Sequence, residues 1–198
     1  RVEEITGKQI AFHPVDICDR VALSTVFERY DIEAVVHFAG LKAVGESVSQ
    51  PLRYYHNNVQ GTLRLCEAMR EHAVFNLVFS SSATVYGDPA SVPILEDFPL
   101  SATNPYGWSK LMNEQMLRDL QYSDPTWRIA ILRYFNPVGA HASGEMLADG
   151  DAQAGGAGRR CGRGAAGDRA QQCSELGLRQ AAAGIDHGDL CGDAVWRA

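Results

Sequence analysis

Short apolar runs that alternate with helical segments constrain the fold of this chain more than any other feature of its sequence. The runs are strand-sized, lack polar alternation, and lie at residues 9–12, 33–38, 76–82 and 128–134. Apolar residues recur at helical intervals in the segments between them, at residues 21–30, 52–69 and 111–120. Strands of this kind are typical of a parallel sheet that helices cover. With right-handed crossovers, the sequence predicts an open, doubly wound α/β sheet.

Small or polar residues follow several of these predicted strands. In doubly wound sheets, ligands bind beyond the carboxyl ends of the strands. Four segments would meet at that rim, namely Asp16-Ile17, Phe38-Ala39-Gly40, Ser80-Ser81-Ser82 and Phe135-Asn136. We therefore expect the functional site at this edge of the sheet.

The two ends of the chain differ from its middle. Gly and Ala supply 23 of the 54 residues from 145 to 198, whereas every Pro, Tyr, Phe and Lys lies before residue 138. Such a segment buries too little apolar surface to offset its backbone entropy, so we expect a disordered or out-of-frame tail. No Gly-rich strand–turn–helix precedes Gln9, which indicates a dinucleotide-binding sheet that is truncated at its amino end. Residues 1–144 are therefore expected to carry the fold and the function.

Composition and charge argue against several classes of partner. The net charge of −6 provides no basic surface for nucleic acid, and no apolar stretch is long enough to span a membrane. The sequence begins without the apolar core of a signal peptide. Five cysteines without framework spacing are typical of reduced thiols, so we expect a cytoplasmic protein. We expect no metal site, because the cysteines of the last segment are widely spaced with a single histidine among them: Cys161, Cys173, His187 and Cys191.

Tyr106 and Lys110 form the pair with the clearest chemical potential. Residues four apart lie one turn apart on the same helix face. A neighbouring cation lowers the pKa of a tyrosine and so makes its phenolate available as a base. Ser82, at the end of a predicted strand, adds a hydroxyl that can share the same substrate oxygen. The structural alternative is a half-buried Tyr106 that covers the stem of Lys110.

Four blocks of sequence carry a more specific resemblance. They are His37–Ser47 (HFAGLKAVGES), Phe79–Gly87 (FSSSATVYG), Asn104–Lys110 (NPYGWSK) and Leu132–His141 (LRYFNPVGAH). In this order, within residues 9–144, they resemble the UDP-glucose 4-epimerases, which belong to the extended short-chain dehydrogenase/reductase group. The resemblance implies that residues 1–144 are a partial, Rossmann-like NAD-binding domain, and it does not extend to residues 145–198.

The resemblance also implies NAD as the cofactor and assigns roles by position. Ser82 and Tyr106 match the catalytic pair, and Lys110 matches the lysine that orients the nicotinamide ribose and lowers the tyrosine pKa. Tyr106 and Lys110 also count among the implied NAD-binding positions, and the others are Asp16, Ile17, Phe38, Ala39, Gly40, Leu41, Lys42, Asn58, Ser80 and Phe135. The positions implied to bind the sugar nucleotide are Lys42, Ser82, Tyr106 and Asn136.

The activity implied by this resemblance is the interconversion of UDP-glucose and UDP-galactose. Tyr106 would take the proton of the 4-hydroxyl while the C4 hydride passes to NAD, and the resulting 4-keto sugar would be reduced on its other face. A homodimer paired through helices is implied as well. Because the pyrophosphate cradle and the substrate lobe of the family have no counterpart here, we expect little or no activity from the chain by itself.

Two other functions compete with this interpretation. A nucleotide-sugar 4,6-dehydratase needs an acid and a base beside the serine, where this sequence has Ala83 and Thr84. A degenerate module that binds NAD or a nucleotide sugar without catalysis is the second alternative. Single residues have plainer interpretations too: Asp16 could cap the following helix, and His37 is expected to pack against helices instead of taking part in catalysis.

Overall fold

The computed structural model describes residues 2–136 of the 198-residue chain. These residues divide between two compact units, one of residues 11–133 and one that includes the described residues 2–10 and 134–136. The short helix α1 (Val2–Thr6) belongs to the second unit, where Glu3 accepts a hydrogen bond from the backbone N–H of Ile10 at 2.7 Å. The predicted boundary at residue 144, the tail and its cysteines lie outside the described residues, so the boundary stays a prediction.

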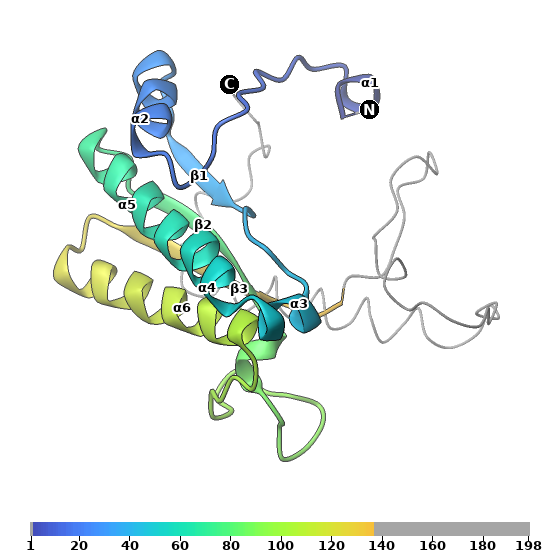
Figure 1. Ribbon diagram of the computed structural model, residues 1–198. Coiled ribbons are helices and arrows are strands. Elements are labelled where there is room, and N and C mark those ends of the chain that lie inside the picture. The colour runs from blue at the N-terminus through green and yellow to red at the C-terminus, as the bar shows by residue number, and fades with distance from the viewer. Residues whose placement is uncertain (1, 137–198) are drawn as a thin grey trace. The chain divides into compact units, whose positions relative to one another are not determined.

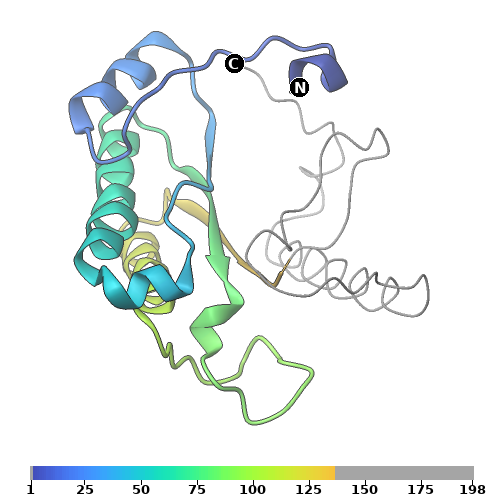
Figure 2. The same cartoon turned by 45° about the vertical axis from the view of Figure 1, so that its right-hand side comes forward.

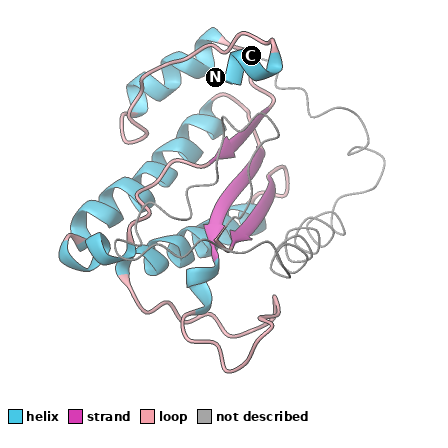
Figure 3. Ribbon diagram, turned by 90° about the vertical axis from the view of Figure 1, so that its right-hand side faces the viewer, coloured by secondary structure: helices cyan, strands magenta, loops and turns pink. Residues whose placement is uncertain are grey.

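Within residues 2–136, three strands form the sheet, in the order β1-β2-β3. They are β1 (Ala34–His37), β2 (Asn76–Ser82) and β3 (Arg128–Tyr134). β1 pairs with β2 in parallel, with Ala34 opposite Asn76 and His37 opposite Phe79. Figure 3 shows the arrows of all three strands running in the same direction. The predicted parallel α/β sheet is confirmed, and all three strands lie where the apolar runs predict them.

Helices join the strands and cover one face of the sheet, where α5 and α6 lie (Figures 1 and 2). The helical elements of this unit are α2 (Arg20–Arg29), α3 (Val44–Ser49), α4 (Pro51–Tyr54), the π-helix η1 (Tyr55–Gln60), α5 (Gly61–Glu71), the 3₁₀ helix η2 (Ala83–Tyr86) and α6 (Pro105–Ser123). α4, η1 and α5 follow one another directly, so they correspond to the single long helix predicted for residues 52–69. The loop that follows η2 extends away from the other helices (Figure 2).

The core lies between the sheet and this helical layer. Along β2 the burial alternates, so that Leu77, Phe79 and Ser81 are buried and Val78 between them is half-exposed. Apolar surface removed from water contributes about 25 cal/mol per Å², which makes this layer the main source of stability. The buried cluster comprises Phe27, Leu65, Cys66, Ala68, Met69, Val74, Leu77, Phe79, Leu117 and Trp127.

One predicted element is wrong. Residues 9–12 form no strand, and the side chain of Phe12 is exposed. A strand needs a neighbour for its backbone hydrogen bonds. Among the described residues the sheet ends at β1 on one side and β3 on the other, and residues 9–12 pair with neither.

Candidate active site

The site is built where β1 and β2 end and α6 begins. Asn104 caps α6 by accepting a hydrogen bond from the backbone N–H of Gly107 at 2.9 Å, and Pro105 occupies the first turn. Both residues favour a helix start at this point. Tyr106 therefore lies in the first turn of α6 and Lys110 one turn further on, and both side chains are buried. The predicted placement of this pair on one helix is confirmed.

Lys110 is held against the end of β2. Its Nζ donates a hydrogen bond to the backbone carbonyl of Ser80 at 2.7 Å and lies 5.0 Å from the ring centroid of Phe79. Burial lowers the pKa of Lys110 to about 8, because an ammonium loses its hydration there. The loop after β1 also approaches this lysine, since a Cβ on Gly40 would lie 3.7 Å from Nζ.

The Ser82 hydroxyl at the end of β2 and burial in α6 act in opposite directions on the Tyr106 phenol. Burial raises the pKa of Tyr106, and the hydrogen bond with Ser82 acts in the opposite direction. A lowered phenol pKa is the effect that a hydroxyl donating toward the phenolate produces. Lys110 is not among the groups that shift the pKa of Tyr106 in this structure, so the lowering expected from Lys110 stays a prediction.

Asn58 joins the loop after β1 to α6. Its Oδ1 accepts from the backbone N–H of Leu41 at 2.8 Å, and its Nδ2 donates to the Leu41 carbonyl at 2.9 Å and to Ser109 Oγ at 3.0 Å. Ser109 in turn donates to the backbone carbonyl of Tyr106 at 2.7 Å. Asn58 lies in the π-helical turn, a local irregularity that is frequent at functional sites. The structure therefore places Asn58 as the connection between the candidate cofactor loop and the helix that carries Tyr106.

His37 is buried at the end of β1, as expected for a packing residue. Its Nε2 lies 2.9 Å from Thr62 Oγ1, and Thr62 donates its own proton to the Asn58 carbonyl at 2.6 Å. A hydroxyl has a single proton, so His37 must be the donor to Thr62. Burial lowers the pKa of His37 to about 4, and the charge of Lys110 adds to this. His37 is thus a neutral structural histidine behind the site.

Asp16 and Ile17 lie in the turn before α2. The side chain of Asp16 accepts from the backbone N–H of Cys18 at 2.8 Å, whereas the cap of α2 is Asp19, which accepts from the N–H of Ala22. The capping alternative for Asp16 is therefore wrong. Ile17 lies against the start of α5, because a Cβ on Gly61 would come within 2.7 Å of Ile17 Cγ2.

The remaining predicted site residues are exposed. Phe38, Ala39 and Lys42 are exposed in the loop after β1. Phe135 and Asn136 directly follow β3, within the other unit. Their roles stay predictions.

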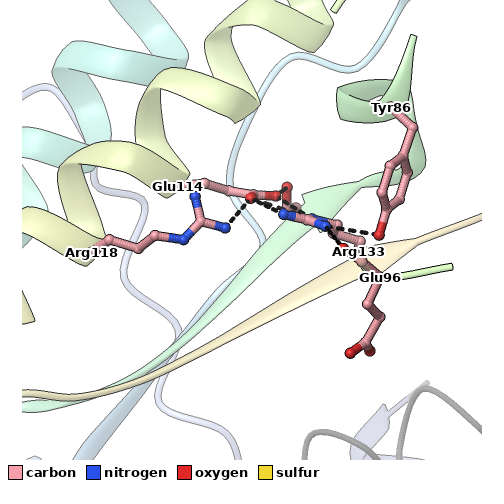
Figure 4. A network of polar contacts seen from close by, with 6 residues as sticks. Tyr86, Glu96, Glu114, Arg118 and Arg133 are labelled. Atoms are coloured by element: carbon pink, nitrogen blue, oxygen red, sulfur yellow. Dashed lines mark hydrogen bonds and ion pairs between the residues drawn. The ribbon is translucent and has the colours of Figure 1, made fainter. Parts of the chain in front are cut away.

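Glu114 is a buried acidic residue at the site that the sequence reasoning missed. Figure 4 shows Arg118 and Arg133 reaching its carboxylate and Tyr86 beside Arg133. Arg133 donates to Glu114 at 2.7 Å and to the Tyr86 hydroxyl at 2.8 Å. Burial alone would raise the pKa of Glu114, but the hydrogen bonds from Arg133 and Ser81 and the neighbouring charges lower it. The four-residue spacing after Lys110 was the sequence signal that could have identified it.

Comparison with known proteins agrees with the fold. The family model described as the NAD dependent epimerase/dehydratase family matches residues 1–153. The UDP-glucose 4-epimerase of Bacillus subtilis is 62% identical over 149 residues, which are 75% of this chain and 44% of that protein. The one from Dictyostelium discoideum is 65% identical over 144 residues, 73% and 42% of the two chains. A crystal structure of the Bifidobacterium longum UDP-glucose 4-epimerase with NAD+ and UDP has a TM-score of 0.70 at 54% identity, covering 72% of this chain and 43% of that one.

The described residues form an α/β protein in which Ser82 ends β2 and Tyr106 and Lys110 lie at the start of α6. The chain belongs to the NAD dependent epimerase/dehydratase family. Its resemblance to UDP-glucose 4-epimerases is confirmed by the relatives described above. The chain spans less than half the length of these relatives.

Proposed function

We propose that this chain carries the catalytic residues of an NAD-dependent epimerase that interconverts UDP-glucose and UDP-galactose at C4. The observation that carries the proposal is the meeting of β2 and α6: Ser82 ends β2, and Tyr106 lies in the first turn of α6, one helical turn from Lys110. The buried ammonium of Lys110 is hydrogen-bonded to the Ser80 carbonyl on β2. A hydroxyl donor, a phenol and a cation in one place suit the removal of a proton from a sugar hydroxyl. The relatives described above are named UDP-glucose 4-epimerases.

Each of the three residues has a distinct task in the proposed reaction. Tyr106, as phenolate, takes the proton of the sugar 4-hydroxyl, and returns it when the 4-keto sugar is reduced on the opposite face. Ser82 donates a hydrogen bond to the oxygen atoms that carry negative charge during this transfer. Lys110 supplies a positive charge that favours the phenolate. NAD, when bound, supplies the acceptor and donor of the C4 hydride.

The described residues fit NAD in two respects. The ammonium of Lys110 has three donors, of which the Ser80 carbonyl uses one, so others remain for a ribose hydroxyl. The loop at residues 38–42 is mostly exposed next to this lysine, and Gly40 allows its close approach because a Cβ there would lie 3.3 Å from Asn58 Oδ1. Asp16 and Ile17 complete the proposed cofactor contacts at the adenine end.

The dehydratase alternative lacks its acid and base in the structure as well. Ala83 has no ionisable group, and Thr84 is hydrogen-bonded to Ser82 Oγ at 3.0 Å. A module that binds NAD or a nucleotide sugar without catalysis remains the second candidate. Bound NAD without turnover would favour that module.

A homodimer and a cytoplasmic location belong to the same proposal. Leu63 on α5, and Trp108 and Met112 on α6, are apolar side chains that remain about 45% exposed, and such surface suits a helix-to-helix interface. The free thiols of Cys18 and Cys66 fit a reducing compartment. Within residues 2–136, none of the helices combines the length and apolarity needed to cross a bilayer.

Deuterium transfer tests the proposed reaction. UDP-galactose labelled with deuterium at C4 is supplied with NAD to the 198-residue chain, and to a chimera in which residues 11–133 replace the matching segment of the Bacillus subtilis relative. The chimera is expected to form UDP-glucose that keeps deuterium at C4, because the hydride returns to the carbon it left. Absence of turnover in the chimera, or exchange of the label with solvent, would contradict the proposal.

A further inference from the structure

The hydroxyl of Ser82 receives two hydrogen bonds from a single neighbour. Thr84 donates to Ser82 Oγ with its backbone N–H at 3.3 Å and with its own hydroxyl at 3.0 Å. Ser82 is the N-cap of η2, so the capping contact fixes the position of Oγ at the end of β2. Capping explains the backbone contact, but it does not require the second one from the Thr84 side chain.

A serine hydroxyl has two acceptor positions and one proton. With both acceptor positions facing Thr84, the proton of Ser82 points away from Thr84. Tyr106, in the first turn of the helix that packs on Thr84, is the neighbour whose pKa the Ser82 hydroxyl lowers. We propose that Thr84 is a positioning residue, which orients the Ser82 hydroxyl so that Ser82 donates its proton toward Tyr106. The inference rests on the proposed function and deepens it, because it assigns Ser82 as a donor and Tyr106 as the group that takes the substrate proton.

The packing between η2 and α6 holds Thr84 in place for this task. A Cβ on Gly107 would lie 3.1 Å from the Thr84 carbonyl oxygen and 3.5 Å from Thr84 Cβ, so the first turn of α6 approaches η2 closely. The backbone N–H of Ser101 donates to the Val85 carbonyl at 3.0 Å, which anchors η2 from the side of the following loop. Thr84 therefore sits between the serine and the helix that carries Tyr106.

The charged and titratable groups near this contact are engaged with other partners. Lys110 on α6 donates to the Ser80 carbonyl, and Tyr86 on η2 accepts from Arg133. The hydrogen bond from Ser82 is also the single effect that lowers the pKa of Tyr106 against the effect of burial. In the proposed orientation, the Ser82 proton faces the Tyr106 phenol and favours its ionised form.

Titration of Tyr106 tests this inference without substrate or turnover. The 198-residue chain is prepared with ¹³C-labelled tyrosine, and the Tyr106 signal is identified by its absence in Tyr106→Phe. The phenolate fraction of Tyr106 is then compared near pH 10 between the wild type, Thr84→Val and the matched control Thr84→Ser, which keeps the hydroxyl. The signals of the other tyrosines show whether a variant keeps the wild-type fold. If Thr84→Val does not keep it, Thr84→Ala is used in its place.

Thr84→Val is expected to decrease the ratio of phenolate to phenol about two- to tenfold, the effect of one lost hydrogen bond, while Thr84→Ser stays near the wild type. Ser82→Ala should give a similar decrease, and Thr84→Val should add nothing in the Ser82→Ala background. An unchanged titration of Tyr106 in Thr84→Val would overturn the inference. So would a decrease in the Ser82→Ala background that is as large as the one Thr84→Val causes in the wild type. Neither result would bear on the deuterium-transfer experiment, so the two proposals fail separately.

Discussion

The carboxylate of Glu114 on α6 accepts hydrogen bonds from two nitrogens of the Arg133 guanidinium on β3, from Nη2 at 2.7 Å and from Nε at 3.0 and 3.3 Å. Ser81 donates to the same carboxylate at 2.6 Å, and the Glu114 side chain is fully buried. The ion pair therefore ties the helix that carries Tyr106 and Lys110 to the two strands beside it. A buried charge of this kind is stable only while its partner is present.

Replacing Glu114 by Gln is expected to destabilise the chain by about 3–5 kcal/mol, because Arg133 would keep a largely buried charge without a counter-ion. The free energy of unfolding in urea is the measurement. Glu67→Gln serves as the control, since Glu67 pairs with Arg64 at a partly exposed i,i+3 position of α5 and should lose less than about 1 kcal/mol. Equal losses in the two variants would contradict the role given to the buried pair.

Acidification is expected to destabilise the chain through His37. Its pKa is about 4 in the folded chain and 6.5 in its ordinary state, so the unfolded chain binds the extra proton between these values. Stability is therefore present above about pH 6.5 and decreases as the pH falls toward 4, by about 3 kcal/mol for this group. The lowered pKa of Glu114 adds a loss at lower pH, where its folded form becomes protonated.

Unfolding free energies at pH 7 and pH 4.5 test this linkage. His37→Gln should reduce the difference between the two pH values, because glutamine takes up no proton. His56→Gln, at an exposed position of η1, is the control and should keep the wild-type difference. An undiminished pH dependence in His37→Gln would mean that His37 does not cause it.

Gly61→Ala is expected to destabilise the chain and weaken NAD binding. The added Cβ would lie 2.7 Å from Ile17 Cγ2, so either the start of α5 or the turn at Asp16-Ile17 must shift. Gly45→Ala in α3 is the matched control, because nothing lies within 4 Å of its Cβ position and alanine favours a helix by about 0.5–1 kcal/mol. In urea unfolding, Gly61→Ala should lower the free energy of unfolding and Gly45→Ala should raise it. A Gly61→Ala chain that is more stable than the wild type would refute the packing argument.

Lys110→Met is expected to move the alkaline-favoured limb of the pH–rate profile upward in the chimera with the Bacillus subtilis relative. The reason is the loss of the cation that favours the Tyr106 phenolate when the cofactor is bound. The profile is measured with saturating NAD and UDP-galactose. An unshifted profile with reduced turnover would show that Lys110 positions the cofactor without tuning Tyr106.

The sequence predicted the elements with strong apolar patterns most accurately. β2 runs from Asn76 to Ser82 as the apolar run predicts, because Leu77 and Phe79 have to be buried against the helices. Residues 9–12 have a similar composition but no strand to pair with among the described residues. A strand depends on its neighbours, whereas an apolar run is a local feature.

The candidate site was predictable where its residues follow a motif. Tyr106 and Lys110 are four apart, and Ser82 ends a strand, so sequence reasoning brought them together. Thr84 and Glu114 were missed in their present roles, because each acts through hydrogen bonds to residues that are near in space only in the folded chain. The π-helical turn around Asn58 has no local sequence signal for the extra residue per turn.

The conversion of UDP-galactose to UDP-glucose by Tyr106→Phe tests the central claim most directly. The chimera that contains residues 11–133 is compared with its Tyr106→Phe variant by proton NMR of the two sugar nucleotides, at saturating NAD. Because phenylalanine cannot take the proton of the 4-hydroxyl, turnover should fall by about 10²–10⁴ while the fold and NAD binding are kept. Turnover close to that of the unmodified chimera would contradict the assignment of Tyr106 as the catalytic base.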